Sequence, residues 1–304
     1  MGPWERLPQL FAYGLVSGSV ITLGAIGLSL THSILRFANF AHGDLMTAGA
    51  YIALGFLLVF QRIPALRGHF GRLSFGPAMI PAFLLALLGT GILAIAIDRL
   101  VYRRLRRARP VMLLMLSVGV AFVLRNLILF SAGADPYYYS HRIQRAIHIL
   151  GVRLKVDQVF IIALGFVLVV LLHLFLTRTR IGKAMRAMAD NPELAQVTGI
   201  DTERVIAWTW GIGAALAAAG GILSGIENKL ITPQLGWQAL LPLFAAVVLG
   251  GIGSPYGAMA GGMLIGITQE LSTAFISTAY KPAVAFGILV LMLILRPQGL
   301  FGRR

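Results

Sequence analysis

Cysteine is absent from this sequence, and charged residues are scarce. Disulfide frameworks, thiolate metal sites and cysteine nucleophiles are therefore excluded across all 304 residues. Acidic and basic residues together make up only 12% of the chain, about half the share found in an ordinary soluble domain. Hydrophobic residues, in contrast, make up 58%. At about 20 apolar residues per membrane crossing, this composition predicts an all-α polytopic transmembrane bundle of roughly eight or nine spans.

Nine apolar runs divide the chain, which we interpret as a single transmembrane domain over residues 1–304. The run 237–252 is short and contains Pro242, so we expect it to be broken or tilted. The nine runs cover residues 10–31, 38–60, 77–98, 111–131, 158–177, 204–227, 237–252, 255–277 and 281–296.

The basic residues predict the orientation of these spans. The formal net charge is +15, but the lysines and arginines lie in short loops between apolar runs, which indicates topology and argues against a nucleic-acid partner. The densest loops, 99–109 and 178–204, are expected to face the cytoplasm together with the basic C-terminal tail. An even number of crossings must then separate residues 204 and 296. The N-terminus is predicted to lie outside and the C-terminus in the cytoplasm.

A polar cluster interrupts the second apolar run. It consists of Asn39, His42, Gly43 and Asp44. A carboxylate inside a membrane span is costly, so such groups usually face a bundle interior or a wet path. Gly43 permits a local break, after which the N–H groups of a half-helix would favour a carboxylate. We therefore predict that this cluster lines a translocation path; the alternative is that these side chains bond to one another or to the backbone and hold a bend.

The segment 178–204 contains signals for a short helix. Asp190 or Asn191 is suited to cap its start, with Pro192 and Glu193 in the first turn, and Gly199 is suited to end it. Asp201 or Thr202 would cap the span that follows. This helix is predicted to dock a cytoplasmic partner; the alternative is an amphipathic helix that lies on lipid.

Other features are predicted to be structural. Glycines spaced four residues apart, such as Gly14 with Gly18 and Gly262 with Gly266, form flat helix faces for close packing. The outer loop 132–157 is expected to form a small hairpin around Gly151, either as a cap or as a docking site for a receptor. Arg125 and Glu270, which lie within spans, are expected to snorkel or pair. The sequence has no phosphate-binding loop, no hydrolase motif and no histidine spacing that suits a metal.

Four segments together resemble the permease subunits of ABC importers for branched-chain amino acids, with a likeness that runs from about residue 10 to 302. In that family the cytoplasmic helix corresponds to the loop that contacts the ATPase. Its general pattern is Glu-Ala-Ala followed by Gly, which Glu193, Ala195 and Gly199 match, while Leu194 replaces the first Ala. The segments are NFAHGDLMTAGAY, RAMADNPELAQVTGIDTERVIAWTWGIGAALAAAGGIL, VVLGGIGSPYGAMAGGMLIG and LILRPQGLFG.

This resemblance implies an ABC importer permease fold and several partners in the bacterial or archaeal cytoplasmic membrane. They are a second related permease, commonly in a heterodimer, two cytoplasmic ATPase subunits that bind ATP and Mg, and an extracytoplasmic solute-binding protein. The chain itself would hold no cofactor and would be no enzyme, and 178–204 would be its coupling loop, with Asn191, Glu193, Ala195 and Gly199 at the ATPase. Urea, short amides or another small polar solute remain alternative cargoes, and an ion-coupled secondary transporter is a weaker alternative.

Overall fold

A computed structural model describes residues 3–68, 70–106, 108–140, 142, 144–149 and 151–301. In these residues nearly all regular structure is helical, and the single sheet is a two-stranded hairpin. The α-helices are α1 Pro3–Leu35, α2 Ala41–Phe60, α3 Met79–Ile97, α4 Arg103–Leu105, α5 Pro110–Ala132, α6 Val156–Arg178, α7 Arg180–Asp190, α8 Pro192–Val197, α9 Thr202–Asn228, α10 Leu235–Gly250, α11 Pro255–Ser272 and α12 Lys281–Leu295. The strands are β1 Ile147–Ile149 and β2 Val152–Leu154, and short 3-10 turns cover Pro64–Leu66 and Thr278–Tyr280.

Each of the nine predicted apolar runs contains one long helix. Among the described residues, seven helices are long and apolar enough to cross a membrane: α1, α2, α3 with its continuation to Leu105, α5, α6, α9, and α12 with the turn before it. The apolar helix α10 is shorter, and it is continuous through Pro242, which excludes the break and leaves the tilt as the remaining expectation. Neighbouring groups in a buried bundle can satisfy the backbone that a proline frees. The prediction of an all-α polytopic bundle is confirmed.

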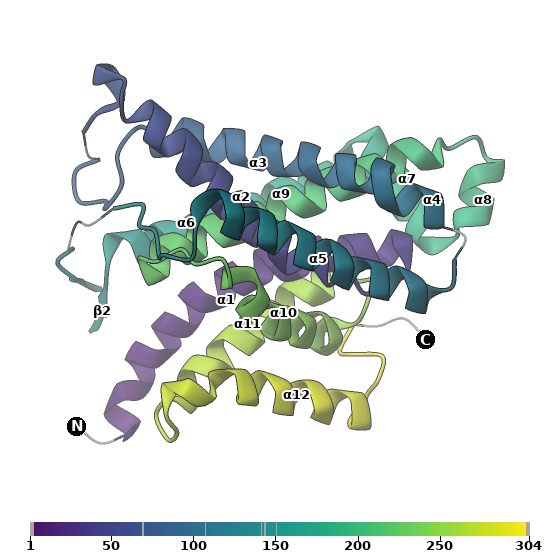
Figure 1. Cartoon of the computed structure of the whole chain (residues 1–304). Coiled ribbons are helices and arrows are strands. Elements are labelled where there is room, and N and C mark those ends of the chain that lie inside the picture. The colour runs from purple at the N-terminus through teal and green to yellow at the C-terminus, as the bar shows by residue number, and fades with distance from the viewer. Residues whose placement is uncertain are drawn as a thin grey trace.

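The bundle has two distinct ends (Figure 1). The start of α1 and strand β2 lie at one end, whereas α4, α7 and α8 lie at the other. At this second end the tail joins α10, since the N–H of Leu300 donates to the Leu249 carbonyl at 2.9 Å. The predicted hairpin is present, with Gly151 in the turn at φ 83°. The described part of the chain therefore begins and finishes at opposite ends, as the predicted topology requires.

Glycines bring the helices into backbone contact, as their four-residue spacing predicted. The helices α1 and α11 pack along their length, and a Cβ on Gly266 would overlap the Cα of Gly18. One turn away, a Cβ on Gly262 would lie 2.6 Å from the Cα of Thr22. Such close approach is possible only with small residues, and in a membrane it is a main source of helix association.

The helix α2 begins in the interior of the bundle. The Nε2 atom of His42, in its first turn, lies 2.9 Å from the carbonyl oxygen of Gly24. Gly24 is in the middle of α1, about 16 Å along the helix axis from Leu35. The connecting residues 36–40 therefore turn back along α1 before α2 starts, and Arg36 makes this reversal with φ 55°.

The helix α10 begins at the same point in the interior. The N–H of Gly236 donates to the Oγ1 of Thr47 at 2.9 Å. A Cβ on Gly236 would overlap the carbonyl oxygen of Gly43, so glycine is required for this contact. The first turns of α2 and α10 thus meet inside the bundle.

Two features beside the basic loops differ from the prediction. The third span was expected to end at residue 98, but a π-turn at Asp98–Tyr102 joins α3 to α4 and continues the helix to Leu105. This extension is possible because the buried Asp98 carboxylate pairs with Arg106, which compensates its charge. The segment 178–204 also holds α7, an additional helix that buries Met185 and Met188.

Candidate functional site

Asp44 forms a bidentate ion pair inside the bundle. Its Oδ1 and Oδ2 atoms accept from Nε and Nη2 of Arg125, both at 3.0 Å. The Asp44 side chain is completely buried, and that of Arg125 is 13% exposed. In this bidentate geometry the carboxylate and the guanidinium lie in one plane. Each charge then compensates the other in a place from which water is excluded.

Two aromatic rings also lie close to the guanidinium of Arg125. The Cζ atom of Arg125 lies 4.7 Å from the ring centroid of Trp237 in α10 and 5.7 Å from that of Phe122 in α5. Cation–π contacts of this kind favour a positive group that has lost part of its water. Trp237 and Phe122 are 47% and 53% exposed, so the charged pair lies just beneath an open face formed by α2, α5 and α10.

Asn39 and His42 face the interior rather than this open face. Both are completely buried. The Oδ1 of Asn39 accepts from the N–H of Ala41 at 3.1 Å, and His42 bonds the Gly24 carbonyl. One nitrogen of each, Asn39 Nδ2 and His42 Nδ1, has no partner within the described residues. These two side chains hold the reversal before α2.

The structure therefore divides the predicted cluster between the two alternatives. Asn39, His42 and Gly43 have the geometry of a bend, and Asp44 alone connects the cluster to the open face. From the sequence, Arg125 was expected to snorkel or pair, but Asp44 was not identified as its partner. The two residues are 81 positions apart in the sequence, so no local pattern indicated the pairing. One signal was available: the second apolar run contains an aspartate and the fourth contains an arginine, and charged residues inside membrane spans usually pair with one another.

The helix α8 is fixed at both ends, as the sequence predicted. The Oδ1 of Asn191 accepts from the N–H of Leu194 at 3.0 Å. Gly199, at φ 85°, follows the C-cap, and the N–H of Ile200 donates to the Ala195 carbonyl at 3.1 Å. With the Gly199 N–H bonded to Gln196, this is a Schellman motif, which stops the helix at a defined residue.

The side chains of α8 separate into an inner and an outer set. Ala195 is 3% exposed and packs against the chain itself. Leu194 and Val197 are 60% and 85% exposed, and Glu193 is also exposed. The two exposed apolar side chains on this helix are therefore available for contact with another chain.

Charged residues connect the start of α9, which follows α8, to the end of the α3 extension. Asp201 caps α9 by accepting from the N–H of Arg204 at 3.1 Å. Two residues later, Glu203 pairs with Arg106, which also holds Asp98 at the end of α3. The start of α9, which follows α8 after the link 198–201, is thus tied to the end of the α3 extension.

The opposite end of the bundle is closed by its own contacts. Asp157, at the start of α6, accepts from Gln144 at 2.7 Å and pairs with Lys229 at 3.3 Å. The hydroxyl of Tyr139 donates to the Ala50 carbonyl at 2.8 Å, and burial raises the pKa of Tyr139 well above its ordinary value. Glu270 pairs with Lys281 at 2.6 Å, as expected for a carboxylate within a span. These contacts support the prediction that the segment 132–157 caps this end.

A polytopic helical bundle with a charged pair beneath one face and a capped helix projecting at one end has the architecture of a transport permease. Consistent with this, residues 10–293 match the family described as branched-chain amino acid transport system / permease component. The chain belongs to this family, whose members are transport components and not enzymes.

The chain is also similar to individual curated proteins of this kind. It is 33% identical to the high-affinity branched-chain amino acid transport system permease protein BraD of Pseudomonas aeruginosa, covering 98% of both chains. It is 33% identical to LivH of Escherichia coli, covering 98% of this chain and 96% of LivH. A permease protein of the same named system, LivM of Escherichia coli, is 30% identical over 149 residues, 47% of this chain and 35% of LivM.

Among solved structures, the chain resembles PsaBC from Streptococcus pneumoniae, which was determined in complex with a Fab. The TM-score is 0.53 at 14% identity, with 98% of this chain and 97% of the other covered. This likeness establishes the fold alone. The predicted ABC importer permease fold is confirmed.

Proposed function

We propose that this chain is the membrane-spanning subunit of an ATP-driven importer, with branched-chain amino acids as its cargo. The family and the names of BraD and LivH support this cargo. ATP and Mg are bound by separate ATPase subunits, and an extracytoplasmic binding protein delivers the amino acid. The end that carries α4, α7 and α8 faces the cytoplasm, in accordance with its dense basic residues.

The single observation that carries this proposal is the geometry of α8. It is a six-residue helix with a capped start, a Schellman end and two exposed apolar side chains. Because both ends are fixed, a partner that pulls on Leu194 and Val197 moves the whole helix and, through the short link 198–201, the start of α9. The ATPase pair is the partner that this coupling requires.

The open face of α2, α5 and α10 is the translocation surface. A zwitterionic amino acid needs brief partners for both its charged ends. Arg125 offers a guanidinium to the carboxylate, and Asp44 offers an acceptor to the ammonium, while their mutual pairing keeps both compensated when no cargo is present. The exposed rings of Trp237 and Phe122 beside them suit an aliphatic side chain.

A second permease covers this face from the other side of the path. The partial match to LivM, in an organism that also has LivH, supports a related but different chain as the partner. The path then lies between the two permeases, and each contributes one wall.

The coupling role of α8 is tested with Val197→Asp in the complete transporter complex. The variant is expected to assemble with the second permease but to lose the ATPases on copurification, together with leucine uptake. The matched control is Leu295→Asp, which places the same charge at another exposed apolar residue, 70% exposed, at the end of α12. Normal ATPase binding and uptake in the Val197 variant would reject α8 as the coupling helix. Uptake of leucine compared with urea, by the same complex with its own binding protein, tests the cargo separately.

A further inference from the structure

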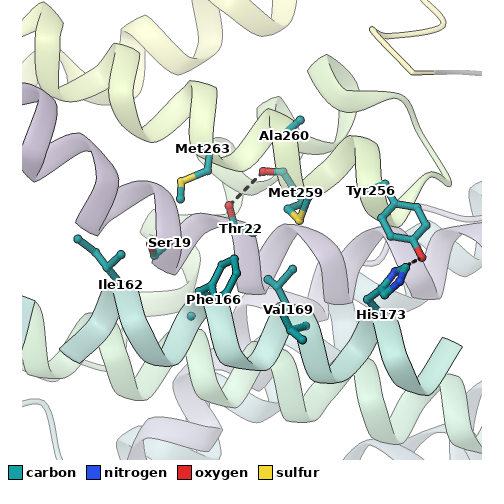
Figure 2. A pocket seen from close by; sticks show the side chains of 12 residues that line it. Ser19, Thr22, Ile162, Phe166, Val169, His173, Tyr256, Met259, Ala260 and Met263 are labelled. Carbon is teal, nitrogen blue, oxygen red and sulfur yellow. Dashed lines mark hydrogen bonds between the residues drawn. The ribbon is translucent and has the colours of Figure 1, made fainter. Parts of the chain in front are cut away.

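A deep apolar groove runs along the outside of the bundle between α6 and α11, over α1 (Figure 2). It encloses about 460 Å³. Its walls include Phe166 and Val169 from α6 and Met259 and Met263 from α11. The hydroxyl of Thr22, on its floor, already donates to the Met259 carbonyl at 3.2 Å. Away from its end at His173 and Tyr256, the groove thus suits an apolar occupant.

The dimensions of the groove match one leaflet of a membrane. Its lining on α6 extends from Ile162 to His173, about 16 Å of helix. The hydrocarbon core of a bilayer is about 30 Å thick, so the groove spans close to half of it. Phe166, on its rim, is 70% exposed. A hydrocarbon chain of the surrounding leaflet has direct access to this groove.

One end of the groove is polar. The Nδ1 atom of His173 lies 2.8 Å from the hydroxyl of Tyr256, and this pair closes the end nearest α7. Beyond it lies a second cavity of about 520 Å³, which shares Tyr256 with the groove. The two cavities therefore adjoin at the Tyr256 side chain.

The second cavity is cationic. Arg36 and Arg186 line it, with Asp190 as the acidic side chain and His32 as a further titratable group. Both arginines are exposed; Arg186 lies on α7, and Arg36 directly follows α1. A phosphate group suits two arginines because guanidinium groups bind its oxygens with two hydrogen bonds each.

We propose that the groove and this cavity together bind one anionic phospholipid. One acyl chain lies in the groove between α6 and α11, and the phosphate headgroup lies between Arg36 and Arg186. The lipid comes from the leaflet on the side of α7 and α8, which is the cytoplasmic leaflet if the orientation under Proposed function holds. Anionic lipids attract basic residues most strongly at that leaflet. A helix of a second subunit fits less well, since an apolar helix face would leave the cationic cavity unfilled.

The test uses the complete transporter complex in nanodiscs with a photoactivatable phosphatidylglycerol that carries a diazirine in its acyl chain. Crosslinks are mapped by peptide mass spectrometry, and a phosphatidylcholine with identical chains is the zwitterionic probe. The variants are Arg36→Gln with Arg186→Gln, which removes the cationic cavity, and Ala260→Trp, which fills the groove. Arg180→Gln, a change of an exposed arginine also on α7, is the matched control.

The expected result is phosphatidylglycerol labelling of peptides from α6 and α11. The double arginine variant should lower apparent affinity for phosphatidylglycerol about thirtyfold, since each basic residue near an anionic membrane surface is worth roughly fivefold. Ala260→Trp should abolish labelling by both lipids, and Arg180→Gln should change neither. Inorganic phosphate at millimolar concentration should not compete, because the acyl chain supplies most of the binding.

Three outcomes would overturn the proposal. Equal labelling by both lipids, unaffected by the arginine variant, would mean ordinary contact with bulk lipid. Crosslinks from this groove to a peptide of the second permease would make it a subunit interface. Competition by inorganic phosphate would make the cationic cavity a free anion site. None of these results depends on cargo or ATP, so the proposal can fail while the proposed transport function stands.

Discussion

Replacing Arg125 should lower the free energy of unfolding more than replacing Asp44 does, although both changes break the same ion pair. Arg125→Met leaves a completely buried carboxylate without a partner, which costs about 3–5 kcal/mol of stability. Asp44→Asn costs less, about 1.5–3 kcal/mol for the lost charged hydrogen bonds, because Arg125 is 13% exposed and keeps its contact with the Trp237 ring at 4.7 Å. The double variant should lose less stability than the sum of the losses in the two single variants. The difference, which is the coupling energy of the pair, should be about 2 kcal/mol.

The assay for this pair is unfolding of the purified complex in mixed micelles, followed by helix content, with leucine uptake measured in parallel. Arg125→Lys serves as the control for charge alone, since lysine keeps the charge but loses the planar bidentate contact. If the two single effects add within about 0.5 kcal/mol, or if Asp44→Asn costs more than Arg125→Met, the assignment of a coupled, asymmetrically buried pair is wrong.

Three further predictions concern packing, the coupling helix and topology. Gly266→Leu should prevent stable folding because its Cβ would overlap the backbone of Gly18, while Gly287→Leu on α12, where no atom lies within 4 Å of the added Cβ, should have a normal melting temperature. Gly199→Val should lower uptake without loss of assembly, because a β-branched residue at φ 85° is strained and would shift the end of α8; unchanged uptake would count against this. A cysteine at Lys183 should be protected from an impermeant reagent in intact cells and one at Ser140 should react, and the opposite pattern would reverse the orientation.

Features that depend on local sequence were predictable. The caps of α8 at Asn191 and Gly199 lie within a few residues of the helix, and the structure has both. The nine helices follow from the lengths of the apolar runs. The glycine spacing of α1 and α11 predicted a packing face, although it did not identify which face meets which.

Features that depend on tertiary structure were not predictable. The depth at which α2 starts is set by contacts with α1 and α10, and the polar cluster in the run 38–60 indicated a break there but not its depth in the bundle. The pairing of Asp44 with Arg125 joins different helices across 81 residues, and the single chain offers no signal for register between them. The continuation of α3 to Leu105 depends on the partner of Asp98, Arg106, which the basic loop concealed among other arginines.

The central claim, that the face of α2, α5 and α10 lines the path, is tested most directly by thiol accessibility. Because the chain has no cysteine, single cysteines at Phe122 and Trp237 can be probed in the assembled complex with a small water-soluble methanethiosulfonate. Leu88, 63% exposed in the middle of α3, is the control for a surface that faces lipid. We expect the reagent to modify both positions, ATP to change the rate of modification, leucine to slow it, and Leu88→Cys to stay unmodified. If Phe122→Cys and Trp237→Cys react no faster than Leu88→Cys in every state, this face lines no aqueous path and the account is wrong.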